Sequence, residues 1–230
     1  MSDELSIPAS LGPGQVVSGK YRIDRAIGLG GMGVVLSAWH EALEQRVAIK
    51  VLLSGRTSRK EHRERFLREA RIAARIRSNY ACRVIDVGET ADHQPFIVME
   101  HLDGSDLGEL LERNGPFPIH EACSHVFQAC EALAEAHAQG IIHRDIKPAN
   151  VFLTTTPTGQ PCIKVLDFGI SKVGETSELT GTNVVLGSVR YMAPEQAQDA
   201  KSADARSDIW SLGVVLFRLL SNARPFDAPS

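Results

Sequence analysis

The side chains best suited to chemistry stand in two short runs: residues 143–150, which read His-Arg-Asp-Ile-Lys-Pro-Ala-Asn, and residues 167–169, which read Asp-Phe-Gly. Together they supply two carboxylates, an ammonium group and an amide carbonyl. Transfer of a phosphoryl group between two oxygens needs Mg²⁺ at the phosphates, a carboxylate near the incoming hydroxyl and positive charge where negative charge spreads. The two runs therefore predict phosphoryl transfer, with far more specificity than a lone His-Arg-Asp.

A glycine-rich run, residues 28–33, reads Gly-Leu-Gly-Gly-Met-Gly and fits the GxGxxG pattern of two unrelated phosphate-binding solutions. In a dinucleotide-binding fold, such glycines stand between a strand and a helix. Here residues 34–39 follow, a β-branched and aromatic run that favours a strand. The pattern therefore indicates a hairpin over phosphates, where missing Cβ atoms let backbone N–H groups approach the anion. On the glycines alone, an ordinary turn is the commoner interpretation.

These motifs resemble those of the eukaryotic-like protein kinases, and most closely the bacterial serine/threonine kinases. The resemblance extends over about residues 21–227. It implies an α+β, two-lobed protein kinase-like fold, with a small antiparallel β-sheet lobe that carries one helix and a larger, mainly helical lobe. That larger lobe is expected to lack its last helices here. One departure is residues 78–82, where many relatives carry a His-Pro motif.

The resemblance assigns catalytic roles by position. Asp145 matches the catalytic base, and Lys147 matches the lysine that serine/threonine kinases place at the γ-phosphate. Lys50, at the end of the apolar run 47–50, matches the lysine that holds the α- and β-phosphates. Glu69 matches the helix glutamate that pairs with this lysine, although a salt bridge to an arginine of its own helix is the simpler alternative.

The resemblance also implies ATP as the nucleotide and Mg²⁺ as the metal, with Mn²⁺ as a substitute. Asn150 and Asp167 match the metal ligands, and oxygen ligands of this kind suit Mg²⁺. In the hinge between the lobes, Met99 would limit the depth of the adenine pocket, while backbone groups of Glu100 and Leu102 would bond the adenine edge. Four apolar residues would sandwich the adenine ring, or could equally be plain core. The expected nucleotide contacts are Gly28, Leu29, Gly30, Gly31, Met32, Gly33, Val35, Ala48, Lys50, Met99, Glu100, Leu102, Phe152 and Leu166.

A hydroxyl-rich segment between Gly169 and residues 193–195, Ala-Pro-Glu, resembles a kinase activation loop. Thr180 and Thr182 match loop threonines that bacterial relatives phosphorylate, so autophosphorylation in trans is expected. Arg144 would pair with the resulting phosphate. The family also uses an aspartate at the position of Asp208 to hold the backbone of the catalytic loop.

Composition narrows the partners. The 230 residues are 43% hydrophobic and 23% charged, which is ordinary for a globular protein, and a net charge of −3 gives no reason to expect nucleic acid. No apolar run approaches a membrane span. The cysteines form no CxxC pair, and Cys123 and Cys130 stand too far apart on a helix for a disulfide. We therefore expect a reduced, cytoplasmic compartment and protein substrates.

Three regions are expected along the chain: a flexible lead-in (1–20), an ATP-binding lobe (21–102) and a catalytic lobe (103–230). In the first lobe, strands are expected at 21–27, 34–39, 46–53, 83–87 and 96–101, with a helix at 59–77. In the second, residues 120–139 predict a helix, and residues 208–220 predict a buried helix because apolar residues surround it. The expected apolar stripe of the helix 120–139 is Val126, Phe127, Cys130, Leu133 and Ala134.

Two other functions compete with a protein kinase. A kinase-like binding or scaffold module is the main alternative, because a lobe without its last helices could keep its catalytic residues and still be impaired or self-associate. A small-molecule phosphotransferase is disfavoured, since those enzymes lack the Ala-Pro-Glu and activation-loop pattern.

Overall fold

The computed structural model of the protein describes residues 7–30, 33–53, 59–168, 189–199 and 202–226. The chain forms two compact units. The first comprises Met1–Ala74 and Arg83–Leu102, and the second comprises Arg75–Cys82 and Asp103–Ser230. The short segment Arg75–Cys82 belongs to the second unit because its backbone bonds to a strand there, with Cys82 N–H donating to the carbonyl of Val165 at 2.9 Å.

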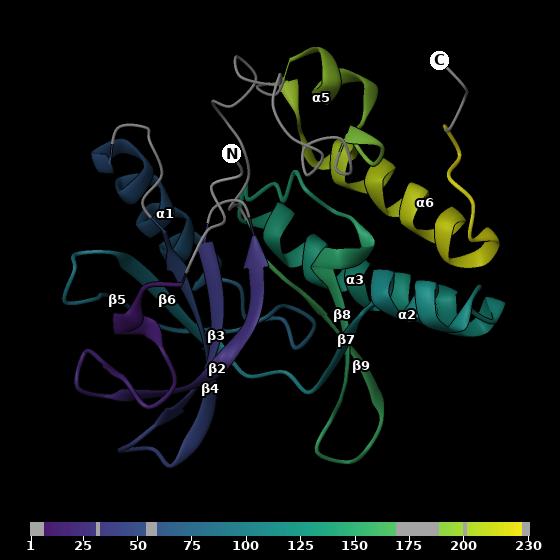
Figure 1. Ribbon diagram of the computed structural model, residues 1–230. Coiled ribbons are helices and arrows are strands. Elements are labelled where there is room, and N and C mark those ends of the chain that lie inside the picture. Colours follow the sequence, from purple (N-terminus) through teal and green to yellow (C-terminus); the bar gives the residue numbers. More distant parts are fainter. Residues whose placement is uncertain (1–6, 31–32, 54–58, 169–188, 200–201, 227–230) are drawn as a thin grey trace, which may run out of the picture. The chain divides into compact units, whose positions relative to one another are not determined.

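The first unit is built on an antiparallel six-stranded sheet in the order β1-β2-β3-β4-β6-β5 (Figure 1). One helix, α1, packs against β5 and β6 through Phe66, Ala70 and Ala73, which are buried and recur at helical spacing. The α+β class expected from the sequence is confirmed. The elements are β1 (Val16–Val17), β2 (Tyr21–Gly30), β3 (Gly33–His40), β4 (Gln45–Leu52), α1 (Arg59–Ala73), β5 (Val84–Glu89) and β6 (Pro95–Glu100).

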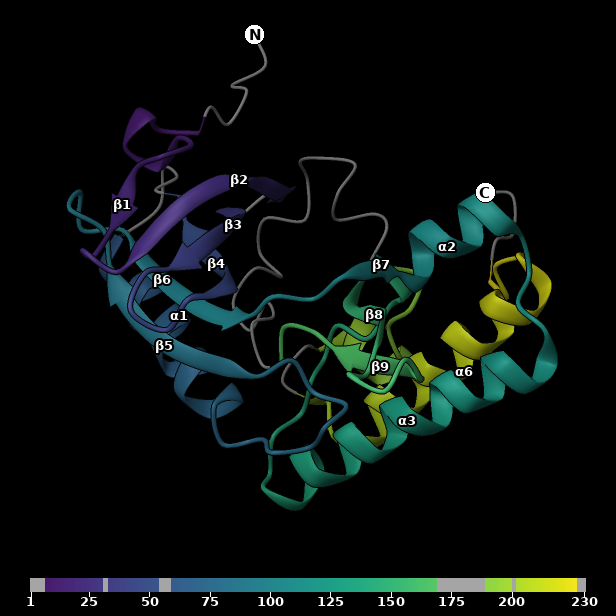
Figure 2. The same cartoon turned by 90° about the horizontal axis from the view of Figure 1, so that it is seen from below.

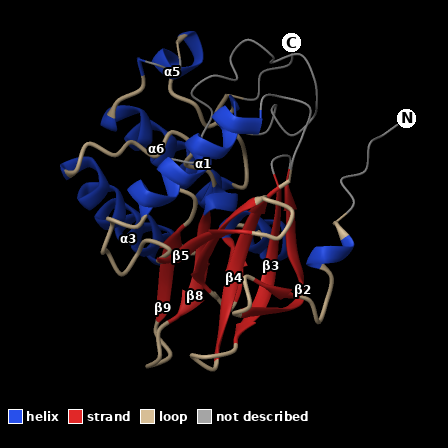
Figure 3. Ribbon diagram, turned by 90° about the vertical axis from the view of Figure 1, so that its left-hand side faces the viewer, coloured by secondary structure: helices blue, strands red, loops and turns tan. Residues whose placement is uncertain are grey.

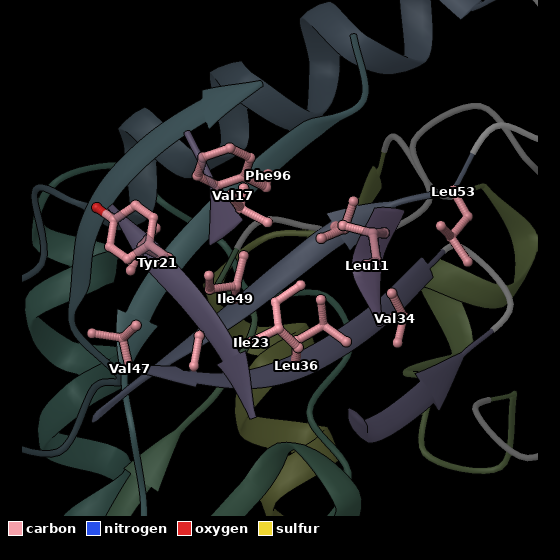
Figure 4. Packing of buried hydrophobic residues seen from close by; sticks show 13 residues of the cluster. Leu11, Val17, Tyr21, Ile23, Val34, Leu36, Val47, Ile49, Leu53 and Phe96 are labelled. Atoms are coloured by element: carbon pink, nitrogen blue, oxygen red, sulfur yellow. The ribbon is translucent and has the colours of Figure 1, made fainter. Parts of the chain in front are cut away.

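The core of this unit follows from alternation along the strands. Side chains of a strand point to opposite faces in turn, so every second residue faces the same side. In β3 the buried positions include Val34 and Leu36, and in β4 they include Val47 and Ile49 (Figure 4). The two central strands thereby share one apolar face. Its packing supports the end of the sheet at which the glycine-rich hairpin lies.

The predicted flexible lead-in is wrong for residues 7–19. Leu11 and Val17 are almost fully buried in the core of the first unit. A short 3₁₀ turn, Ala9–Leu11, precedes β1, which pairs with the start of β2. The burial of two apolar side chains and the pairing of β1 with β2 hold this segment in place, although its glycines and prolines suggested a flexible lead-in.

The second unit combines helices with a three-stranded sheet in the order β7-β8-β9. Helices α3 and α6 run side by side and contact each other, and α3 also contacts β9 (Figure 2). Among the described residues, no helix has both the length and the apolar character that crossing a bilayer demands. The elements are β7 (Gly104–Asp106), α2 (Leu107–Asn114), α3 (Ile119–Ala138), the 3₁₀ turn η2 (Pro148–Asn150), β8 (Val151–Thr155), β9 (Pro161–Val165), α5 (Pro194–Gln198) and α6 (Ala205–Ser221).

Helix α3 buries a different face from the predicted one. Phe127 is 64% exposed and Ala134 is also exposed, while Leu133 alone of the expected stripe is fully buried. The buried face consists mainly of alanines, which have no long side chains and so allow neighbouring backbones to approach closely. The remaining buried residues of the helix are Ala122, His125, Ala129, Ala132 and Ala136.

Helix α6 is buried on one face only. Leu212, Val215 and Leu219 are buried, whereas Ile209 and Phe217 are 54% and 45% exposed. The prediction of a buried helix is therefore confirmed for one face, while the other face is apolar but open among the described residues.

His125 is the one buried imidazole of α3 without a hydrogen bond to the described residues at either nitrogen. Its ring meets Phe117 edge to face, with ring centroids 5.7 Å apart. Burial lowers the pKa of His125 below its ordinary value of 6.5, and the negative charge of Glu121 only partly opposes this shift. The folded protein therefore favours the neutral imidazole.

We predict that His125 makes the protein less stable in acid. Because its pKa is lower in the folded than in the unfolded chain, its stabilising contribution is complete above pH 6.5 and is lost as pH falls through the folded-state pKa. The melting temperature should therefore fall less between about pH 7.5 and pH 5.5 in His125→Leu than in the wild type. The exposed His120, changed to Leu, is the matched control. An unchanged pH slope in His125→Leu would contradict the prediction.

Candidate active site

The candidate catalytic loop, residues 143–150, lies between α3 and β8 in the second unit. Ile146 within it is almost fully buried, and Ile141 and Val151 on either side are buried as well. These apolar residues anchor the loop, while Arg144, Asp145 and Lys147 stay partly exposed and His143 and Asn150 are buried. The anchored backbone thereby presents the side chains of Asp145 and Lys147 at the surface.

Asp145, Lys147 and Asn150 form one connected cluster. The ammonium Nζ of Lys147 lies 2.8 Å from Oδ2 of Asp145. The amide Nδ2 of Asn150 donates to the backbone carbonyl of Asp145 at 2.7 Å and to Oδ2 at 3.1 Å. Both donors contact the same carboxylate oxygen, so the Asp145 side chain is held in one orientation while remaining partly exposed.

The hairpin of β8 and β9 (Figure 3) connects Asn150 of this cluster to the residues that lead into Asp167. Strand β8 begins directly after Asn150 and β9 ends directly before Leu166, with Val151 opposite Val165 in the antiparallel register. The N–H of Leu166 then donates to the carbonyl of Asn150 at 2.9 Å. The next residue, Asp167, has a left-handed backbone with φ of 57°. Two residues far apart in sequence thereby become neighbours at one end of a hairpin.

The pair Asn150 and Asp167 fits Mg²⁺ by its chemistry. Because Nδ2 of Asn150 donates to Asp145, the carbonyl Oδ1 is the atom suited to a cation. An amide oxygen and a carboxylate are hard ligands, and Mg²⁺ commonly takes few protein ligands while water and phosphate oxygens complete its shell. No cluster of three or more His, Cys, Asp or Glu suited to a metal occurs among the described residues.

A buried carboxylate, Asp208 of α6, holds the loop backbone. Its side chain is 0% exposed and accepts hydrogen bonds from N–H of His143 (2.9 Å) and N–H of Arg144 (2.8 Å). The ring nitrogen Nε2 of His137 lies 2.7 Å from Oδ2, and because a carboxylate only accepts, this nitrogen carries the proton. The predicted role of Asp208 is confirmed. His137 escaped prediction, since nothing in the sequence marks it except its place at the end of α3.

His143 and Phe168 pack against each other. Both are buried, and their rings meet edge to face with centroids 5.0 Å apart. The ring nitrogen Nε2 of His143 lies 2.8 Å from the carbonyl oxygen of Leu166. This contact ties the catalytic loop to the residues that lead into Asp167.

The glycine-rich run lies in the hairpin of β2 and β3, as the following strand-like residues predicted. Gly28 is opposite Val35, and Gly30 is opposite Gly33. Gly31 and Met32 lie outside the described residues. The hairpin geometry excludes the dinucleotide-binding alternative, in which a helix would follow the glycines.

Lys50 lies near the end of β4, opposite Val35 of β3 and Ile97 of β6. Glu69 falls within α1, but its side chain lies outside the described ones, so the Lys50–Glu69 pair stays a prediction. Ala48 of β4 is buried opposite Met99 of β6. Lys50 and Ala48 are two residues apart on β4, so their side chains lie on the same face of the strand.

At the hinge, Met99, Glu100 and Leu102 are all half-buried. The N–H of Glu100 donates to the carbonyl of Arg83 at 3.0 Å, and its Oε1 accepts from N–H of Arg83 at 2.8 Å. The amide of Glu100 is therefore committed within the sheet.

The other apolar residues expected to contact the nucleotide are only partly buried. Leu29 is 59% exposed, and Val35, Phe152 and Leu166 are half-buried, although Val151 and Val165 beside the last two are fully buried. Apolar side chains left accessible next to buried neighbours suit a ligand surface better than plain core. The expected phosphosites, Thr180 and Thr182, lie outside the described residues.

The motif model for the protein kinase domain matches residues 21–230. The chain belongs to the protein kinase family. A serine/threonine-protein kinase, PknA of Mycobacterium tuberculosis, is 41% identical over 217 residues, which cover 93% of this chain and 49% of that protein. "Probable serine/threonine-protein kinase PknB" of Corynebacterium glutamicum is 39% identical over 220 residues, covering 94% of this chain and 33% of that protein.

Solved structures show the same kinase fold. The crystal structure of the M. tuberculosis PknI kinase domain matches with a TM-score of 0.75 and 31% identity, covering 96% of this chain and 82% of that one. Against the two curated kinases, this chain spans only 33% and 49% of their length. The kinase family and fold are therefore shown over a region that corresponds to about a third to a half of those two proteins.

We predict that substitutions at two glycines of the β2–β3 hairpin differ in their effect on stability. A Cβ at Gly33 would fall on the carbonyl oxygen of Val51, so Gly33→Ala should lower the melting temperature. A Cβ at Gly28 meets nothing closer than 3.7 Å, so Gly28→Ala should melt like the wild type. Thermal unfolding of both variants checks this. Equal losses of stability would contradict the described hairpin geometry.

Proposed function

We propose that this chain is the catalytic domain of an ATP- and Mg²⁺-dependent protein serine/threonine kinase. The observation that carries the proposal is the cluster of Asp145, Lys147 and Asn150, with Asp167 delivered beside it by a hairpin. The names of its relatives support protein hydroxyls as acceptors. The intact cluster gives no support to a module that only binds.

In the proposed reaction, a serine or threonine hydroxyl of a protein attacks the γ-phosphorus of ATP. The new P–O bond forms as the bond to the β–γ bridging oxygen breaks, ADP leaves, and Asp145 accepts the hydroxyl proton. Lys147 and Asn150 both hold Asp145 through Oδ2, so Oδ1 would face the acceptor hydroxyl. Lys147 offers positive charge where the transferred group gains negative charge.

Mg²⁺, when bound, would neutralise the phosphates, and Asn150 and Asp167 would hold it. Lys50, fixed by Glu69, would bind the α- and β-phosphates beneath the glycine-rich hairpin. The accessible apolar side chains and the hinge backbone would hold adenine. What supports this assignment is the match of each position to the kinase pattern.

A reducing compartment suits the chain. Its four cysteines form no CxxC pair in the sequence, and Cys123 is exposed. Structural thiols persist unpaired where glutathione keeps them reduced. We therefore place the kinase domain in the cytoplasm.

We predict that Asp145→Asn and Asp167→Asn each impair phosphoryl transfer, in different ways. The first should lower kcat by about 10²- to 10⁴-fold with ATP affinity nearly unchanged, because Asp145 faces the acceptor hydroxyl. The second should remove Mg²⁺-dependent turnover, because it removes the anionic metal ligand while keeping the shape. Transfer from labelled ATP to a generic protein substrate measures both. Asp92→Asn, an exposed aspartate of the first unit, is the control. Near-wild-type turnover in either active-site variant would refute the assigned role.

We also predict autophosphorylation on Thr180, Thr182 or both, with higher activity afterwards. The guanidinium Nε of Arg144 is buried and has no hydrogen-bond partner among the described residues. A phosphothreonine adds about two negative charges and would satisfy this nitrogen. Mass spectrometry of active protein should find the modification. The double variant Thr180→Ala/Thr182→Ala should be less active than the control Thr155→Ala. An unmodified loop together with full activity of the double variant would rule the prediction out.

A further inference from the structure

Arg144 has an uncommon backbone for a residue with a side chain. Its φ is 67°, in the left-handed region that favours glycine. Such a conformation persists when the surroundings hold it in place. Arg144 directly precedes Asp145, so its backbone sets the direction from which the proposed catalytic base leaves the loop.

Side chains from two other helices hold this backbone on both sides. The N–H of Arg144 donates to Oδ1 of Asp208 at 2.8 Å. The carbonyl of Arg144 accepts from Nε2 of Gln196 at 2.7 Å. The first bond fixes the peptide group before Arg144, and the second fixes the peptide group that joins Arg144 to Asp145.

Gln196 is itself held in place. It lies in α5, is only 7% exposed, and directly follows Glu195. Oε1 of Glu195 accepts from the hydroxyl of Ser207 on α6 at 2.8 Å, and the Glu195 carbonyl accepts from the hydroxyl of Ser202 at 2.7 Å. Helix α5 is thereby attached to α6, so the Gln196 amide reaches the catalytic loop from a fixed base.

We propose that Gln196 is a positioning residue for Asp145. Its amide clamps the peptide group before Asp145 and, together with Asp208, holds Arg144 left-handed. The proposal rests on the proposed function in one respect, namely that Asp145 is the base. The simpler alternative is that Gln196 only satisfies a buried carbonyl and contributes to stability without aiming the carboxylate.

The first test compares Gln196→Met with Gln198→Met. Methionine keeps the length of glutamine but cannot donate a hydrogen bond, and Gln198 is an exposed glutamine of the same helix. Because a displacement of about 1 Å can cost about 10²-fold in rate, Gln196→Met should lower kcat by about 10- to 100-fold. Its KM for ATP should stay within about twofold of wild type, and Gln198→Met should match wild type in both. A kcat equal to that of Gln198→Met would overturn the proposal.

The second test uses the pH dependence of Gln196→Glu. A carboxylate at this position lacks the donor and repels the Arg144 carbonyl, but a protonated carboxyl group can donate again. The ratio of its kcat to that of wild type should therefore rise as pH falls from about 8 to about 6, whereas the ratio for Gln198→Glu should stay flat. Both are measured below the melting temperature of each variant. A ratio for Gln196→Glu that stays flat would contradict the clamp.

Hydrogen exchange separates failure of this proposal from failure of the proposed function. The amides of residues 144 and 145 should exchange faster in Gln196→Met than in wild type and in Gln198→Met. This readout does not depend on activity, so faster exchange in a protein that transfers no phosphate would support the clamp and refute the kinase assignment. Unchanged exchange, with active wild type and inactive Asp145→Asn, would refute the clamp alone.

Discussion

The carboxylate of Asp208 is the interaction on which the catalytic unit depends. A buried charge is costly unless it is fully hydrogen-bonded, and Asp208 has no exposed surface. Its partners are two backbone N–H groups of the catalytic loop and the ring of His137, so the charge can be satisfied only while that loop keeps its conformation. The Asp208 carboxylate therefore couples α6 to the conformation of the loop.

Once the loop is fixed, the β8–β9 hairpin positions the proposed metal ligands. The register that sets Val151 opposite Val165 leaves Asn150 and Asp167 at the same end of the hairpin. Asn150 links the catalytic loop to the hairpin. Its side-chain amide donates to Asp145, and its backbone carbonyl accepts a hydrogen bond from the N–H of Leu166. A shift in this register would separate the proposed metal ligands and the proposed base at once, so the chemistry rests on strand pairing as much as on the acidic residues.

The sequence predicted the features that local pattern and motif encode. Strand alternation located β3 and β4, and the residues after the glycine run indicated a hairpin. It failed where tertiary packing decides. Either the face with Phe127 or the face with the alanines of α3 could have been the buried one, and periodicity alone does not show that it is the alanine face. Leu11 and Val17 look like parts of a loop until the sheet edge is present. Gln196 and His137 act through single hydrogen bonds to distant residues, which leave no periodic or spacing signal in the sequence.

The most direct test of the role of Asp208 compares phosphoryl transfer to a protein substrate by Asp208→Asn and by Asp204→Asn. Asparagine keeps the shape of Asp208 but replaces one acceptor oxygen by a donor that faces N–H groups or His137. Asp204 caps the same helix from an exposed position, and asparagine is an equally good cap. The account predicts a fall in kcat of about 10²-fold or more for Asp208→Asn, with ATP binding retained and Asp204→Asn unaffected. Wild-type kcat in a folded Asp208→Asn protein would contradict it.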